Sequence, residues 1–297
     1  MGQLGRPASS RGEVSGPPEA GAGAGGPRGY GCLTLTTDYG YAGGFVGSLH
    51  AVAFRMAPEL RVIDLDHGVP PQDVRLGALR LERFMRLAPA GVHVGVVDPG
   101  VGGDRRPVAI TAGPHAFVGP DNGLLPWAAE AAGPQLRVVV LDRPGLWLEG
   151  RSRTFDGRDV FVPVAARLAC GLALDEVGTE VDPAGLLRLA RPIARIRHDG
   201  LAELEVLQVD GFGNVQLSGD KATATALELA AGDPVRLAAD GAPEIEAVYA
   251  QTYADVPRGR AAVLIDSDGC LALSVNCGRA DTLFGARLPA RVTLRRA

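Results

Sequence analysis

The pattern of apolar and turn residues along the chain changes near residue 190, and this change most restricts the folds that the chain can adopt. Before that point, apolar and β-branched runs such as 32–38 and 91–98 alternate with segments of helical spacing, such as 73–88. Strands that alternate with amphipathic helices are typical of a mainly parallel sheet with helices on both faces. The segment 107–123 has the pattern of a hairpin added to that sheet. We therefore predict an α/β amino-terminal domain with a mainly parallel sheet.

From residue 193 onward, short strand-like runs dominate, and turn residues separate them at roughly eight to twelve positions. This spacing is typical of an antiparallel barrel or sandwich, and we predict a smaller all-β domain built as an antiparallel barrel. The expected domains are residues 30–188 and 193–297. Residues 1–29 are rich in Gly, Pro, Ser and Ala, with almost nothing to bury, so we expect a disordered leader there.

Charge and composition exclude several classes of protein. The net charge is −4 with both signs interspersed, so no basic stripe is present to bind nucleic acid. The four cysteines form no CxxC pair and, with five dispersed histidines, no zinc pattern, so we expect no metal site. No apolar run reaches the roughly 18 residues needed to cross a bilayer, and the amino terminus has no apolar signal core. We expect a cytoplasmic protein with reduced thiols and neither a membrane nor a nucleic-acid partner.

Acidic residues follow three of the expected strands: Asp38, Asp66 and Asp98. Ligands of open α/β sheets gather beyond the carboxyl ends of the strands, so a site is expected there. The glycine-rich loop 100–103 would let a ligand approach the backbone, and His67 could orient a neighbouring loop. The chain has no complete GxGxxG followed by a helix, no GxxxxGK[ST] and no GxSxG. Dinucleotide binding, phosphoryl transfer and serine hydrolysis are therefore disfavoured.

Seven short motifs, in order, carry a resemblance to a known family. They are "LTTDYG", "VIDLDHGVPPQDVRLGA", "VGVVDPGVGGDRRPVAI", "FVGPDNGLL", "TFDGRDVFVPVAARLA", "DGFGNVQL" and "LIDSDGCLALSVNCGRA". Together they resemble the S-adenosyl-L-methionine hydroxide adenosyltransferase family, whose relatives fluorinate or chlorinate the same substrate. The similarity extends over residues 31–294. It implies an α/β domain followed by a β-barrel, and a homotrimer whose substrate lies between one subunit's first domain and its neighbour's second.

The resemblance also implies a reaction and a set of binding residues. Water or hydroxide would displace methionine from the ribose 5′ carbon of S-adenosyl-L-methionine, giving adenosine and L-methionine without a metal or other cofactor. Asp38 would accept hydrogen bonds from the ribose hydroxyls. The remaining contacts would come from the second domain: Phe212 and Asn214 with adenine, Asp210 with the methionine ammonium, and Ser267 with its carboxylate.

The water-activating set of the family is an Asp, an Arg and a His, and the chain matches it at Asp98 and Arg105. Where the family reads Phe-His-Gly-Arg-Asp, this chain has Asp156 in place of the histidine. Asp156 could then act as the base or as a partner of Arg105. Taken alone, Asp156 or Asp159 could also simply cap the helix that follows.

With Asp156 in place of the family's histidine, three functions remain open. We favour hydrolysis, because the sulfonium is so good a leaving group that modest activation of water suffices. The first alternative is a very slow or non-catalytic protein that binds an adenosyl ligand. The second is a halogenase-like transferase, which Asp98 disfavours because a carboxylate repels halide.

Overall fold

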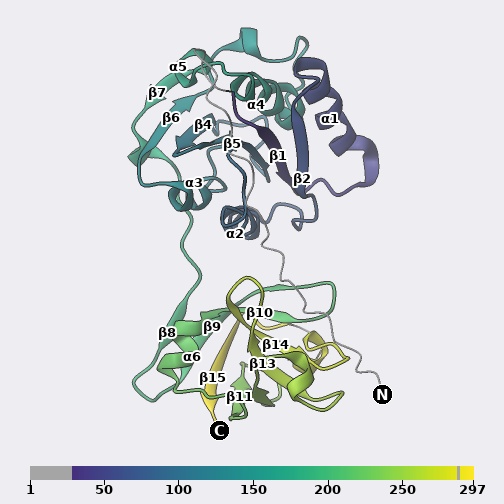
Figure 1. Ribbon diagram of the computed structural model, residues 1–297, viewed down its shortest axis with the longest axis vertical. Coiled ribbons are helices and arrows are strands. Elements are labelled where there is room, and N and C mark those ends of the chain that lie inside the picture. The colour runs from purple at the N-terminus through teal and green to yellow at the C-terminus, as the bar shows by residue number, and fades with distance from the viewer. Residues whose placement is uncertain (1–28, 286–287) are drawn as a thin grey trace, which may run out of the picture.

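The computed structural model describes residues 29–285 and 288–297, so that all but Gly29 of the expected leader lies outside the described residues. Its elements form an α/β part and a β-barrel part, the two regions seen one above the other in Figure 1. The predicted fold class, a mainly parallel α/β domain followed by an antiparallel barrel, is confirmed. In the described part of the chain, no helix has both the length and the apolar character required to cross a membrane.

Sheet A of the α/β domain has the strand order β2–β1–β3–β5–β4–β6–β7. Strand β1 is parallel to β2 and β3, and β3 is parallel to β5. Strands β4 and β5 form the predicted hairpin, and β4 and β7 run against the others. The bounds are β1 (Cys32–Thr37), β2 (Arg61–Asp66), β3 (Val92–Val96), β4 (Pro107–Ala112), β5 (His115–Pro120), β6 (Leu136–Val140) and β7 (Thr179–Val181).

Helices cover both faces of sheet A (Figure 1). On one face, α1 (Phe45–Met56) packs with α4 (Val162–Ala169), and on the other α2 (Val74–Phe84) packs with α3 (Pro126–Ala132). Successive residues of a strand point to opposite faces, so Ala109 joins the first of these cores and Ile110 the second. The short elements are α5 (Leu174–Val177), η1 (Ala42–Gly44), η2 (Pro144–Leu146), η3 (Gly157–Phe161), which is one π-helical turn, and η4 (Pro183–Gly185).

A buried polar chain crosses the amino ends of three strands of this sheet. The Nδ1 atom of His93 lies 2.9 Å from Thr34 Oγ1, and its Nε2 atom lies 2.9 Å from His115 Nδ1. Burial, and secondarily the neighbouring His115, lowers the pKa of His93 to about 3. Burial also lowers the pKa of His115. Both rings are therefore expected to be neutral in the folded protein at neutral pH.

We expect the free energy of unfolding to fall as the pH is lowered from about 6.5. Between there and about pH 3 the unfolded chain takes up a proton at His93 that the folded chain does not bind, so stability is lost as the pH falls. For this one group the loss between pH 7 and pH 5 is about 2 kcal/mol. Urea unfolding at both pH values measures it. A His93→Gln variant should lose less over that interval, and equal losses would contradict the assignment.

Sheet B closes into a barrel in the order β10–β14–β13–β12–β11–β15–β9, because β9 also pairs with β10, and β8 extends from β9. All of its pairs are antiparallel except β12 with β13. A single apolar core fills its inside. The bounds are β8 (Ala194–Ile196), β9 (Ala202–Val209), β10 (Val215–Asp220), α6 (Lys221–Ala226), β11 (Pro234–Ala238), β12 (Ile245–Tyr249), η5 (Tyr253–Asp255), β13 (Ala261–Ile265), β14 (Cys270–Val275), η6 (Asp281–Phe284) and β15 (Arg291–Arg296).

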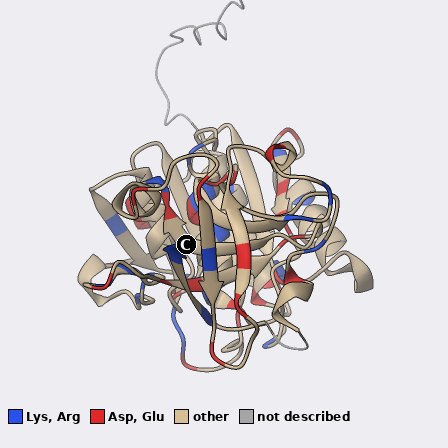
Figure 2. Cartoon of the chain, turned by 90° about the horizontal axis from the view of Figure 1, so that it is seen from below, with Lys and Arg blue, Asp and Glu red and all other residues tan. Residues whose placement is uncertain are grey.

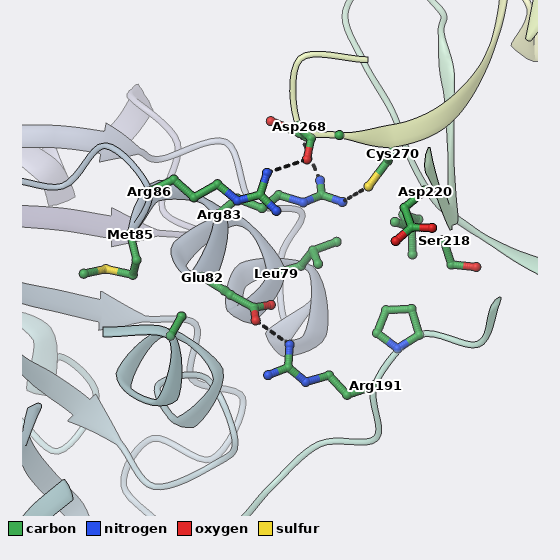
Figure 3. A pocket seen from close by; sticks show the side chains of 14 residues that line it. Leu79, Glu82, Arg83, Met85, Arg86, Arg191, Ser218, Asp220, Asp268 and Cys270 are labelled. Atoms are coloured by element: carbon green, nitrogen blue, oxygen red, sulfur yellow. Dashed lines mark hydrogen bonds and ion pairs between the residues drawn. The ribbon is translucent and has the colours of Figure 1, made fainter. Parts of the chain in front are cut away.

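Arginines in and just after α2 connect the two domains. Arg80 donates through Nε and Nη2 to Gln208 Oε1 of β9, at 3.2 and 2.9 Å. Arg83 Nη1 lies 3.0 Å from Asp268 Oδ2 of the barrel, and Arg86 Nη1 donates to the backbone oxygen of Asp268. Figure 3 shows Arg83 and Arg86 pointing at Asp268 beside a pocket of about 510 Å³ that both domains line. These arginines thus form a polar part of the contact between the domains, beside apolar packing of Leu207 against the core under α2.

The barrel seen from below, as in Figure 2, carries blue and red residues interspersed. Opposite charges pair on it, as between Arg236 and Glu246 on neighbouring strands, and between Arg296 and Asp233. This mixture agrees with the interspersed charge of the sequence.

Candidate active site

A pocket of about 390 Å³ lies at the carboxyl ends of β1 and β3, the edge of sheet A at which the sequence predicts a site. Asp38 follows β1, Asp98 follows β3, and Asp156 precedes η3; all three line this pocket. The structure therefore brings together three of the predicted site residues. Asp66, at the end of β2, does not line it and pairs instead with Arg80 at 2.6 Å.

Asp98 and Arg105 form a bidentate ion pair beside the pocket. Arg105 Nε lies 3.1 and 2.9 Å from the two oxygens of Asp98, and its Nη2 lies 2.5 Å from Oδ2. A tight turn joins the two residues, with Gly102 at a φ of +78°, a backbone conformation that favours glycine. Burial alone would lower the pKa of Arg105, but hydrogen bonds to Asp98 and Asp156 raise it above its usual value. The guanidinium is thus a permanent cation of this site.

Asp156 joins the same ion pair from the other side. Its Oδ2 atom lies 2.6 Å from Arg105 Nη2, so the structure brings Asp98, Arg105 and Asp156 together. Arg151 binds the same carboxylate through Nε and Nη2. The Asp156 side chain makes no capping hydrogen bond, so the interpretation of Asp156 as a helix cap is wrong. The neighbouring Asp159 instead accepts from the backbone nitrogen of Ser152.

Aromatic packing fixes the backbone at Asp156. Phe155 meets the rings of Tyr39 and Phe45 edge-on, with centroids 5.6 and 5.3 Å apart. The residue after Asp156 must be small, because a Cβ atom on Gly157 would lie 2.5 Å from the Tyr39 hydroxyl. The chain then makes the π-helical turn η3, a feature frequent at functional sites. This packing thus accounts for the Phe and the Gly of the "TFDG" motif.

Two residues of the site were missed from the sequence: Tyr39, which lines the pocket, and Arg151, which binds Asp156. Tyr39 lines the pocket, and burial, followed by the charges of the nearby carboxylates, raises the pKa of its hydroxyl well above its usual range. Its position directly after Asp38 was the available signal. Arg151 lies five residues before Asp156 in an irregular loop, where spacing alone indicates no contact.

Hydrogen bonds from the chain around His67 and Gln72 fix the loop that carries Asp38. Asp38 Oδ2 accepts from the backbone nitrogen of Gln72 at 2.8 Å. His67 Nδ1 lies 2.7 Å from Thr37 Oγ1, and the His67 backbone oxygen accepts from the nitrogen of Gly40. His67 therefore contacts the residues on both sides of Asp38, as expected of a histidine that orients a neighbouring loop.

The other four predicted binding residues lie in barrel loops and do not line the pocket. Asp210 shapes one loop, since its Oδ1 accepts from the nitrogens of Phe212 and Asn214 and its Oδ2 from Asn214 Nδ2. Phe212 at the tip of this loop is 81% exposed. Ser267 lies in the turn between β13 and β14, beside Asp268. Within one chain, the residues expected to contact adenine and methionine therefore lie away from the pocket. The residues expected to contact ribose and water line it or adjoin it.

Among residues 29–285 and 288–297, no three or more His, Cys, Asp or Glu side chains are grouped so as to hold a metal ion. The chemistry available at the site is that of Asp38, Asp98, Asp156 and the phenol of Tyr39, which line the pocket, together with the guanidinium groups of Arg105 and Arg151 that bind Asp156.

A mainly parallel sheet with an acidic pocket at its strand ends, followed by a β-barrel, defines a two-domain protein that binds a small molecule. The chain belongs to the S-adenosyl-L-methionine hydroxide adenosyltransferase family. Residues 33–178 match the family's amino-terminal domain and residues 204–293 its carboxy-terminal domain.

Individual relatives agree with this membership. A protein of Salinispora arenicola named (R)-S-adenosyl-L-methionine hydrolase is 50% identical, covering 85% of this chain and 93% of that protein. One of the same name from Thermus thermophilus is 36% identical, covering 86% and 97%. Relatives named fluorinase are 23–25% identical. The crystal structure of an uncharacterized conserved protein from Thermotoga maritima superposes with a TM-score of 0.80 at 32% identity, covering 89% of this chain and 100% of that one.

Proposed function

We propose that this protein hydrolyses S-adenosyl-L-methionine to adenosine and L-methionine. The observation that carries the proposal is the buried Asp98–Arg105 ion pair at the pocket, in a chain 50% identical to a protein named as a hydrolase of this substrate. Hydrolysis is favoured over halogenation because carboxylates at Asp98 and Asp156 disfavour a halide ion in the site.

The reaction needs one displacement at the ribose 5′ carbon. The oxygen of water forms a bond to C5′ as the C5′–S bond breaks, and the bonding electron pair goes to sulfur, which leaves as the neutral thioether of methionine. Water loses one proton, which Asp98 accepts and passes to solvent. Arg105 holds Asp98 in place and stabilises the developing hydroxide, while the positive sulfonium makes the leaving group good without a metal ion.

One chain supplies only part of the binding site. Asp38 holds the ribose from the α/β domain, and Phe212 and Asn214 stack on and pair with adenine from a barrel. Asp210 meets the methionine ammonium, and Ser267 its carboxylate. Because these four barrel residues do not line the pocket and Phe212 is largely exposed, we propose a homotrimer in which a neighbouring subunit's barrel completes each site. Light scattering should give three times the chain mass, and a monomer would contradict the assembly.

Co-expression of two inactive variants tests the shared site. One chain carries Asp98→Asn, and the other carries Phe212→Ala together with Asn214→Ala. Hybrid trimers contain sites built from the intact half of each chain, so activity should recover to about a quarter of that of the wild type under random mixing. If both halves of a site came from one chain, the mixture would show only the mean of the two separate activities.

Chromatography of the reaction products tests the function itself. The purified protein is incubated with S-adenosyl-L-methionine with and without chloride, and the expected products are adenosine and methionine under both conditions. Formation of 5′-chloro-5′-deoxyadenosine would instead identify a halogenase. Ligand binding in calorimetry with no product would identify a binding protein. Because the relatives' name specifies the (R) form, that form should be consumed faster than the (S) form.

We also propose a cytoplasmic location. Its support is that Cys32, Cys170, Cys270 and Cys277 are all free thiols, as is usual in a reducing compartment.

A further inference from the structure

The carboxylate of Asp156 is bound on both of its oxygens by guanidinium groups. Arg105 Nη2 lies 2.6 Å from Oδ2, and Arg151 lies with Nε 2.9 Å from Oδ1 and Nη2 3.0 Å from Oδ2. The Asp156 side chain is fully buried, whereas that of Arg151 is 31% exposed. Arg151 therefore ends a row of alternating charges, Asp98–Arg105–Asp156–Arg151, that begins beside the pocket.

The charges of this row balance only when Arg151 is counted. A single nitrogen of Arg105, Nη2, lies 2.5 Å from Asp98 and 2.6 Å from Asp156, so that one cation serves two buried carboxylates. A buried carboxylate without a counter-charge is costly, and it would draw Arg105 away from Asp98. Arg151 supplies the second positive charge and removes this competition for Arg105.

Arg151 is itself fixed by an aromatic ring. Its guanidinium carbon lies 4.6 Å from the ring centroid of Trp147, a cation–π contact, and Trp147 packs against the apolar core beneath α1 and α4. The row is thus anchored to the core of the α/β domain at the end away from the pocket.

We infer that Arg151 is a positioning residue for water activation: it holds Asp156, which holds Arg105 in the orientation that Asp98 requires. This inference rests on the proposed function and deepens it. In this arrangement Asp156 is an anchor rather than the base, because both of its oxygens accept guanidinium hydrogen bonds and its side chain, although it borders the pocket, is fully buried. Proton transfer from water stays with Asp98.

The first test compares Arg151→Ala with Arg151→Lys and a matched control. Arg151→Ala should lower kcat for adenosine release by about 10- to 100-fold, with KM changed by less than about threefold, since misplaced catalytic groups impair the chemical step. Arg151→Lys keeps the charge and should recover part of kcat. The control is Arg158→Ala, which removes a similar arginine, stacked on Phe155 and paired with the buried Asp159 but not in contact with Arg105. It should keep kcat within about twofold.

The second test asks whether Arg151 acts through Asp156. The Asp156→Asn variant lacks the negative charge that Arg151 balances. Adding Arg151→Ala to this variant should therefore lower kcat by less than about twofold. Asp156→Asn alone should cost about as much as Arg151→Ala, since it breaks the same row. Thermal melting confirms that each variant is folded.

The outcomes separate the inference from the function. Adenosine release by the wild type establishes the function whatever the variants do. An equal loss from Arg151→Ala in both backgrounds, a loss confined to KM, or an equal loss in Arg158→Ala would overturn the role of Arg151. A loss about 100-fold larger in Asp156→Asn than in Arg151→Ala would make Asp156 the base instead. A wild type that releases no adenosine would overturn both proposals.

Discussion

Replacement of Asp98 by Asn is expected to lower the rate of adenosine release by about 10²- to 10⁴-fold, the usual cost of losing a general base. The amide keeps the size of the side chain but neither accepts the proton of the attacking water nor carries the negative charge that Arg105 pairs with. Single-turnover measurements at saturating substrate report the chemical step directly.

Substrate binding provides the control for this variant. Asp98 is paired with Arg105 rather than placed against the ribose, so calorimetric affinity of Asp98→Asn for S-adenosyl-L-methionine should stay within about threefold of that of the wild type. Asp38→Ala should show the opposite behaviour, weakening binding by about 1–3 kcal/mol through unpaired ribose hydroxyls. A full rate in Asp98→Asn would remove Asp98 from the chemistry.

Arg105→Gln should abolish measurable hydrolysis and also destabilise the fold. It leaves the buried carboxylate of Asp98 without its guanidinium partner and Asp156 with Arg151 alone, and breaking a buried ion pair by removing one partner costs about 3–5 kcal/mol. Urea unfolding measures the loss in the free energy of unfolding, and product chromatography measures the loss of activity.

A double variant separates these two effects. Arg105→Gln with Asp98→Asn removes one charge of each sign, so it should regain much of the lost stability while staying inactive. Recovery of activity together with stability would show that the ion pair only supports the fold. An unchanged melting temperature in Arg105→Gln would contradict the buried-charge argument.

The fold and the acidic residues at the strand ends could be predicted because they depend on local patterns, whereas Arg105 and Asp156 were assigned through the family resemblance. In residues 32–169, the spacing of apolar residues in strands and helices indicates which side chains are buried between the sheet and its covering helices. Because β1 and β3 are parallel neighbours, their carboxyl ends lie at one edge of the sheet, and this places Asp38 near Asp98. The turn from Asp98 to Arg105 is short enough for its ends to meet.

Contacts made by irregular segments could not be predicted in the same way. Arg151 reaches Asp156 across a loop with no repeating geometry, and Tyr39 owes its position to the rings of Phe45 and Phe155. The capping interpretation of Asp156 was wrong because the guanidinium groups of Arg105 and Arg151, rather than backbone nitrogens of the helix, bind its oxygens.

The arginines of α2 have a consequence for how the family can diverge. Arg80 and Arg83 reach the barrel from one side of a helix that begins directly after the Gln72 loop, the same loop that binds Asp38. Insertion of one residue within α2 would turn everything beyond it by about 100° and remove the barrel contacts together. Evolution can therefore exchange residues along this helix far more readily than it can alter its length by a single position.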